Sequence, residues 1–283
     1  MDNYLLVSNK KDSVCVNELK NIANILLVML LSVILPRLVL SQKAQSQYEK
    51  LTRDGKKVYE NYCIGCHGIK GNGNGLAARF LYPKPRDFTR GIFKFRTTPS
   101  GSLPTEEDLY KTITRGLHRT SMPGFSLLSE RQRLAVVAYI KTFSKLWQKR
   151  KPKPPIFLPE PPDWLGESES VKRGKEVYML LGCHNCHGET GKGDGSSAET
   201  LEPDVWGNRQ KPFNFTRGQL KGGPGVKDIY KTFMTGLNGT AMPSYADFFE
   251  NPPPESPIQK EDIWHLISYI LSLRVDETKY VQK

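Results

Sequence analysis

Cysteine and histidine are scarce in this sequence, which has five of each among 283 residues. Four of the five cysteines lie in two short C-x-x-C-H segments, at 63–67 and 183–187. The remaining one, Cys15, has no cysteine near it and is assigned no role. This distribution excludes a small fold that depends on several disulfide bonds.

A strand pattern is missing as well, since no long alternation of apolar and polar residues occurs anywhere. The glycine-rich segments 71–75 and 191–195 superficially resemble phosphate-binding loops, but neither follows a predicted strand. We interpret them as turns that need the backbone freedom of glycine. No nucleic-acid-binding motif is present, so nucleotide and nucleic-acid partners are not expected.

Long apolar runs are absent too. Residues 22–35 are apolar and follow three lysines, but Pro36 and Arg37 interrupt them before the roughly 20 residues that a membrane span needs. The segment 1–41 is therefore predicted to be a signal peptide, cleaved after Ser41 or Ala44, or else a retained membrane anchor. Either alternative predicts a periplasmic or equivalent extracytoplasmic location for the rest of the chain.

The second half of the sequence repeats the first at a fixed distance. C-I-G-C-H at 63–67 returns 120 positions later as C-H-N-C-H, and L-Y-K-T at 109–112 returns 120 positions later as I-Y-K-T. Met122-Pro123 recurs as Met242-Pro243 at the same distance. These ordered matches predict two copies of one domain.

The repeat divides the chain into parts. The first copy is predicted to span 42–148 and the second 166–283, with 149–165 as a proline-rich linker that is extended and semi-rigid. Each copy is expected to be all-α, from helical spacing and capping signals. The expected helices are 48–62, 105–116 and 129–143 in the first copy, and 170–182, 226–236 and 260–273 in the second.

The C-x-x-C-H segments carry the chemistry. This motif attaches haem c, because its two thiols form thioethers with the haem and the histidine becomes the fifth iron ligand. Two covalently bound haem c groups are therefore predicted, on Cys63, Cys66 and His67 and on Cys183, Cys186 and His187. A redox dithiol or a four-cysteine zinc site would use the same cysteines, but neither explains the histidine that follows each pair.

A methionine follows each histidine at the same spacing. Met122 lies 55 residues after His67, and Met242 lies 55 residues after His187. A thioether suits the distal face of haem iron and raises its reduction potential, so both methionines are predicted as sixth ligands. His118, four residues before Met122, is the alternative ligand. Ligation by His118 in place of Met122 would favour an enzyme, such as a dihaem peroxidase, in which one iron loses or changes its sixth ligand.

With these motifs the sequence resembles the class I c-type cytochromes in tandem, over about residues 48–275. Gly55, Tyr59 and Tyr139 match the residues at which that family's terminal helices cross, and Gly174 and Tyr178 answer them in the second copy. The resemblance also implies a proline carbonyl against each proximal histidine. The candidates are Pro83 or Pro85 in the first copy and Pro203 or Pro212 in the second. Arg86, Arg90 and Arg217 are candidate partners of the haem propionates.

One loop motif adds a second resemblance. P-R-D-F-T at 85–89 is similar to a segment of dihaem cytochromes found beside periplasmic molybdenum oxidoreductases and nitrite-oxidising complexes. Two irons that each have a histidine and a methionine ligand leave no position open for substrate, which predicts an electron-transfer protein rather than an enzyme. It would carry single electrons between respiratory partners, either as a free shuttle or as a fixed subunit of a larger oxidoreductase assembly.

Charge is divided unequally between the copies. Residues 42–150 carry 21 Lys and Arg against 8 Asp and Glu, whereas residues 151–283 carry 16 against 18. We therefore expect an acidic docking surface on the partner of the first copy. The basic residues expected to steer that partner are Lys56, Lys57, Lys70, Lys84, Lys94 and Arg96.

Overall fold

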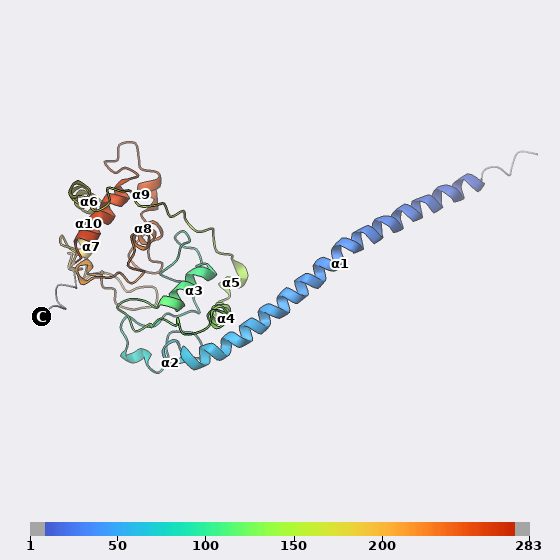
Figure 1. The fold of residues 1–283 in the computed structure, drawn as a ribbon, viewed down its shortest axis with the longest axis horizontal. Helices are drawn as coiled ribbons and strands as arrows, with labels where there is room; N and C mark the ends of the chain where they lie inside the picture. Colours follow the sequence, from blue (N-terminus) through green and yellow to red (C-terminus); the bar gives the residue numbers. More distant parts are fainter. Residues whose placement is uncertain (1–8, 275–283) are drawn as a thin grey trace, which may run out of the picture. The chain divides into compact units, whose positions relative to one another are not determined.

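The computed structural model describes residues 9–274, and within that range it contains helices and no strands, as predicted (Figure 1). The chain divides into two units, residues 1–51 and 52–283. The first eight residues of the predicted leader and the last nine of the second copy lie outside the described range. Among the described residues, no helix combines the length and the hydropathy needed to cross a membrane.

The described residues of the first unit, 9–51, form one helix, the beginning of α1 (Asn9–Tyr62). We predicted a helix only from residue 48, and α1 begins 39 residues earlier. Residues 9–47 contain no glycine and a single proline, Pro36, so little in their composition interrupts a helix. Residues 52–62 of α1 belong to the second unit and open the first copy of the repeat.

Helices α3 (Glu106–Arg115) and α4 (Glu130–Lys141) begin where the sequence predicted, although α4 ends two residues before the predicted residue 143. Thr105 and Asp108 form a capping box at the start of α3, and Ser129 and Gln132 form one at the start of α4. Gly116 ends α3 with a positive φ of 71°. Besides α1, the elements of this copy are α2 (Ile64–His67), η1 (Ala78–Phe80), α3 (Glu106–Arg115), α4 (Glu130–Lys141) and α5 (Leu146–Lys149).

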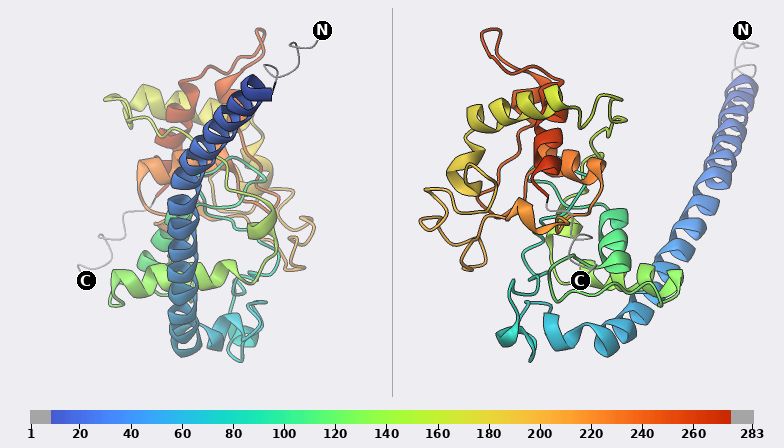
Figure 2. Two further views of the ribbon diagram at one scale, coloured as in Figure 1. Left: turned by 90° about the vertical axis from the view of Figure 1, so that its right-hand side faces the viewer. Right: turned by 60° about the vertical axis from the view of Figure 1, so that its left-hand side comes forward.

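The second copy repeats the main helices of the first, but its 3-10 helix lies at a different place, α5 has no counterpart, and the short helix α9 (Ala246–Glu250) is additional. Its elements are α6 (Ser168–Leu180), α7 (Cys183–His187), η2 (Phe215–Arg217), α8 (Val226–Thr235), α9 (Ala246–Glu250) and α10 (Asp262–Ser272). In the first copy α1 crosses α4, and in the second α6 crosses α10, as Figure 2 shows for the second pair. The additional helix α9 lies in the stretch between the methionine and the last helix, and its Phe249 is buried in the core.

Glycine permits the close crossing of the terminal helices, as the resemblance implied. An ideal Cβ on Gly55 would lie 1.9 Å from the carbonyl oxygen of Ala135 in α4. A Cβ on Gly174 would lie 1.9 Å from the carbonyl oxygen of His265 in α10. One turn further along α1, the ring of Tyr59 packs edge-to-face on Tyr139, with centroids 5.3 Å apart. Each crossing therefore excludes any side chain at its glycine.

The two copies pack against each other within the second unit through basic side chains of the first copy. Arg96 donates to the carbonyls of Thr235 and Gly236 at the end of α8, at 2.6 and 3.2 Å. Arg115 donates to the Gly222 carbonyl at 2.7 Å. Lys94 pairs with the buried carboxylate of Asp204 at 3.3 Å.

This interface corrects one expectation. Lys94 and Arg96 were predicted to steer an external partner, but Arg96 is 1% exposed and Lys94 binds within the interface. The positive charge of the first copy is in part an internal complement to the carbonyl and carboxylate oxygens of the second copy. Charge counts cannot distinguish these uses, because both place a cation in the same stretch of sequence.

The proline-rich linker contacts both copies. The backbone N–H of Ile156 donates to the Thr97 carbonyl in the first copy at 2.8 Å. The side chains of Ile156 and Leu158 pack against the core of the second copy. Between α5 and residue 162 the linker has no regular secondary structure, which agrees with the extended chain that its prolines favour.

We expect Asp228→Asn to destabilise the protein in a pH-dependent way. Burial alone would raise the pKa of Asp228, but Lys231 at 2.7 Å and Arg115 at 3.5 Å outweigh it and lower the pKa. A lowered folded pKa stabilises the native state above the unfolded value of about 3.9, and this is lost as pH falls through the folded pKa. Urea unfolding should show a loss of about 1–2 kcal/mol at pH 7. A loss that does not shrink as the pH falls below the unfolded pKa would contradict this.

Candidate functional site

The C-x-x-C-H segment of the first copy forms α2 and the residue before it. Cys63 caps the helix, and His67 at its end is buried, with its ring stacked on Phe88 at a centroid distance of 4.5 Å. His67 Nδ1 donates to the carbonyl of Arg86 at 2.9 Å. This bond fixes the tautomer and leaves Nε2 with a free lone pair for a metal.

The second copy builds the same arrangement on α7. The ring of His187 stacks on Phe215 at 4.5 Å, and its Nδ1 donates to the carbonyl of Phe213 at 3.0 Å. Burial lowers the pKa of both histidines, so each imidazole is neutral at pH 7. A neutral imidazole with one nitrogen already donating is the form that binds a metal ion.

The identity of the carbonyl partner corrects a prediction. We expected Pro83 or Pro85 to accept from His67, and Pro203 or Pro212 to accept from His187. In each copy the acceptor is the residue that follows a candidate proline, Arg86 after Pro85 and Phe213 after Pro212. The loops were identified correctly, but which of two adjacent carbonyls turns inward depends on backbone dihedrals that the sequence pattern does not reveal.

None of the four cysteines in these segments is paired in a disulfide. Burial raises the pKa of Cys63 and of Cys183 to about 12, so neither is a thiolate at pH 7. This direction is opposite to the lowered thiol pKa that is typical of reactive dithiols. Among the residues that the structure describes, no group of three or more His, Cys, Asp or Glu side chains is arranged to hold a metal ion.

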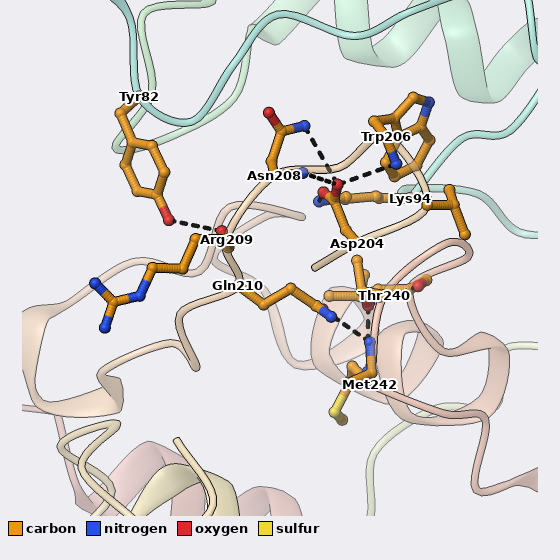
Figure 3. Close-up of polar contacts among 12 residues, drawn as sticks. Tyr82, Lys94, Asp204, Trp206, Asn208, Arg209, Gln210, Thr240 and Met242 are labelled. Atoms are coloured by element: carbon orange, nitrogen blue, oxygen red, sulfur yellow. Dashed lines mark hydrogen bonds and ion pairs between the residues drawn. The ribbon is translucent and has the colours of Figure 1, made fainter. Parts of the chain in front are cut away.

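The two predicted methionine ligands lie in matching loops. Leu117 N–H donates to the Met122 carbonyl at 3.1 Å, and Leu237 N–H donates to the Met242 carbonyl at 3.1 Å. The backbone N–H of each methionine donates to the hydroxyl of the threonine two residues before it. Figure 3 shows this contact for Thr240 and Met242. Both loops thus hold their methionine in the same backbone conformation.

All eight predicted site residues line one cavity of about 1000 Å³. The cavity extends through both copies, so the two C-x-x-C-H segments and the two methionines face a shared space. Its walls include apolar side chains from the helices of each copy, among them Val58, Leu109 and Ile140 in the first. The sequence predicted the members of each site but not that the sites would be continuous.

The charged lining of this cavity fits two haem groups. Two haems bring four propionate carboxylates, and the lining holds eight basic side chains but only two acidic ones. The indole Nε1 of Trp206 is buried and has no hydrogen-bond partner, so it offers a further donor for a carboxylate. The basic residues are Arg79, Lys84, Arg86, Arg90, Lys94, Arg209, Lys211 and Lys221, and the acidic ones are Asp87 and Asp204.

Trp206 and its neighbours were not identified from the sequence. The guanidinium of Arg86 lies 3.5 Å from the Trp206 ring centroid, and burial lowers the pKa of Arg86 to about 10. Asp204 accepts from the backbone N–H groups of Trp206 and Asn208 (Figure 3). The only feature of the sequence that could have pointed to these residues is the extra length of this loop in the second copy. The added residues have no counterpart in the first copy.

The remaining candidates are placed as follows. Arg86 and Arg90 line the cavity, whereas Arg217 does not and offers its carbonyl to Arg119 instead. His118 is not among the lining residues, which weakens it as an alternative ligand. His265 stacks on Trp164 at 4.4 Å within the last helix crossing, as a structural residue would.

Comparisons with known proteins agree with this geometry. Residues 50–140 match the family model of cytochrome c oxidase, cbb3-type, subunit III, and residues 171–274 match that of cytochrome c. Among solved structures, a chain of a Kuenenia stuttgartiensis reducing HAO-like protein complex is 44% identical, with a TM-score of 0.72. The match covers 79% of this chain and 97% of that chain. A comparison with curated proteins gave no match.

Two cytochrome c domains imply two covalently bound haem c groups and haem-based electron transfer. The paired C-x-x-C-H segments, the oriented histidines and the basic cavity supply what those groups require. The chain therefore belongs to the c-type cytochromes, as a dihaem member with two cytochrome c domains in tandem.

Proposed function

We propose that this protein carries single electrons between redox partner proteins through two haems, each with one histidine and one methionine ligand. His67 and Met122 would bind the first iron, and His187 and Met242 the second. The observation that carries the proposal is the single cavity lined by all four ligands and all four attachment cysteines. Each haem supplies an iron that alternates between two oxidation states by gaining or losing one electron.

The chain's own residues prepare this site in three ways. The Arg86 and Phe213 carbonyls hold the histidine rings in one orientation. The hydroxyls of Tyr59 and Tyr178 donate to the carbonyls of Gly68 and Gly188, at 2.7 and 2.6 Å, and hold the turn after each histidine. Apolar walls exclude water around both groups, which together with a thioether ligand favours a high potential.

The solved relative favours a fixed subunit over a free shuttle. That chain belongs to a reducing HAO-like protein complex, and nearly its whole length matches. We therefore infer that this protein serves as an electron-transfer subunit beside an oxidoreductase. An extracytoplasmic location follows from the predicted leader and from covalent haem attachment, with either a free or an N-terminally anchored chain.

An enzymatic role, such as that of a dihaem peroxidase, would need an iron without its sixth ligand. Both copies offer a methionine from the same loop, and His118 lies outside the cavity lining. These observations support electron transfer without catalysis at either haem.

The ligand assignment is tested by Met122→His and Met242→His, made separately. Each change should lower the potential of one haem by at least about 0.1 V, within the roughly 0.8 V range that axial ligands span. A spectroscopic redox titration, with haem counted per chain, measures this, and the methionine-to-iron charge-transfer band should halve in each variant. Met179→Leu, in α6, is the control. An unchanged potential in either histidine variant would contradict the assignment of that methionine.

A further inference from the structure

A short turn in the first copy covers the haem-attachment helix α2 and carries an unusual set of side chains. It comprises residues 76–84 and includes η1. Its backbone is tied to α2 on both sides of Leu76, because Gly75 N–H donates to the Cys66 carbonyl at 3.0 Å and Ala77 N–H donates to the Gly65 carbonyl at 2.9 Å. The turn is therefore a rigid part of the first haem site.

The outward side chains of this turn are apolar and basic. Leu76 is 89% exposed, Phe80 76% and Tyr82 56%. The guanidinium of Arg79 lies 4.7 Å from the Phe80 ring centroid, and Lys84 Nζ donates to the Ala78 carbonyl at 2.9 Å. These contacts join the apolar and basic residues into one surface. Arg79, Tyr82 and Lys84 also line the haem cavity, so the surface is continuous with its wall.

The second copy shows that the turn does not need Leu76 or Phe80, whereas the Tyr82 hydroxyl donates to the Arg209 carbonyl of the second copy at 3.1 Å. Its turn 196–204 makes the same backbone bonds, from Gly195 N–H to the Cys186 carbonyl at 3.2 Å and from Ser197 N–H to the Asn185 carbonyl at 2.8 Å. Ala, Leu and Pro recur 120 positions later at 198, 201 and 203. The outward residues differ throughout: Leu76, Arg79, Phe80, Tyr82 and Lys84 are replaced by Ser196, Glu199, Thr200, Glu202 and Asp204.

Exposed leucine and phenylalanine that the fold does not require indicate a surface used for binding. We propose that turn 76–84 is where an oxidoreductase docks, through a surface that is apolar at its centre and carries carboxylates at its rim. The charge on the turn selects an acidic partner, and its position beside α2 brings that partner to the first haem. The inference rests on the proposed electron-transfer function and adds which copy meets the partner.

The test exchanges the apolar residues for those that the second copy carries. The variant is Leu76→Ser with Phe80→Thr. The matched control, Leu127→Ser with Phe157→Thr, makes the same two changes at exposed positions outside the turn. The probe is the other component of the Kuenenia stuttgartiensis HAO-like complex, and its Kd is measured at low and physiological salt. We expect at least a tenfold weaker Kd for the turn variant and less than a twofold change for the control.

A second variant tests the basic residues of the turn separately from the apolar ones. Arg79→Glu, again the residue of the second copy, should slow association and reduce its dependence on salt. Equal binding by the turn variant and the wild type would overturn the proposal. So would wild-type binding to anionic vesicles or to a second copy of the chain instead of the probe. The redox titration of the turn variant should still give two haems at unchanged potentials. A haem count below two in the wild type and the variant alike would count against the proposed function itself.

Discussion

Replacement of Arg96 by methionine should lower the free energy of unfolding by about 3 kcal/mol, because it removes a buried cation from three carbonyl partners. Arg96 is 1% exposed and donates to the carbonyls of Thr235, Gly236 and Lys94. Two of these carbonyls end α8, where the helix dipole favours positive charge. Burial lowers the pKa of Arg96 only to about 10, so it remains a cation at pH 7.

The loss of stability in this variant should be larger at the second haem site than at the first. Gly236 begins the loop that ends at Met242, and Leu237 N–H in the same loop donates to the Met242 carbonyl. The first copy thus supports the proposed methionine ligand of the second through Arg96. In Arg96→Met, we expect the charge-transfer signal of the second haem to disappear at lower urea than that of the first.

Urea unfolding followed at this band and by far-ultraviolet circular dichroism measures both effects. The control is Arg131→Met, whose side chain is exposed and pairs with Asp54 at 3.2 Å. It should cost less than about 1 kcal/mol. Loss of both methionine signals at one urea concentration would contradict the specific support of Met242, even if stability falls as expected.

The second large effect is expected from Gly174→Ala. A methyl group there would lie 1.9 Å from the His265 carbonyl oxygen and 2.9 Å from the Tyr269 Cβ. Both belong to α10, so the two helices must separate and disturb the core beneath them. We expect a loss of about 3 kcal/mol or more, which outweighs the roughly 1 kcal/mol that alanine gains over glycine within a helix.

Gly65→Ala provides the comparison, because no atom lies within 4 Å of the position its Cβ would take. That change should alter stability by no more than about 1 kcal/mol in either direction. Urea unfolding of both haem-loaded variants measures the difference. If Gly174→Ala unfolds at the same urea concentration as the wild type, the helices of the crossing can move apart without cost, and the argument from close approach is wrong.

Much of this architecture could be predicted from the sequence because it depends on local signals. The helix start at Thr105 was predicted from the acidic residues after it and the start at Ser129 from capping-box spacing, and both residues form capping boxes. Gly55 and Gly174 were identified as crossing points through the family resemblance, and both lie at a helix contact. In each case a residue type is required by backbone geometry within a few residues, or by a contact repeated in both copies.

The errors arose where a choice depends on partners distant in sequence. Lys94 and Arg96 were read as surface charges, yet their partners, Asp204 and the end of α8, lie more than 100 residues away. The carbonyl partner of His67 was expected to be Pro83 or Pro85, and it is that of Arg86, 19 residues from the histidine. The 120-residue repeat gives no information on contacts between the copies, because it describes only what each copy has in common.

By itself, the sequence determined that the chain carries two haem-attachment segments in two copies of one helical domain. Those features follow from covalent chemistry and local backbone preference, which need no knowledge of distant contacts. Only the tertiary structure decided that the copies form one compact unit around a shared cavity, with Trp206 and Arg86 in its wall. The physical reason is that burial and charge pairing between the copies depend on how their surfaces meet.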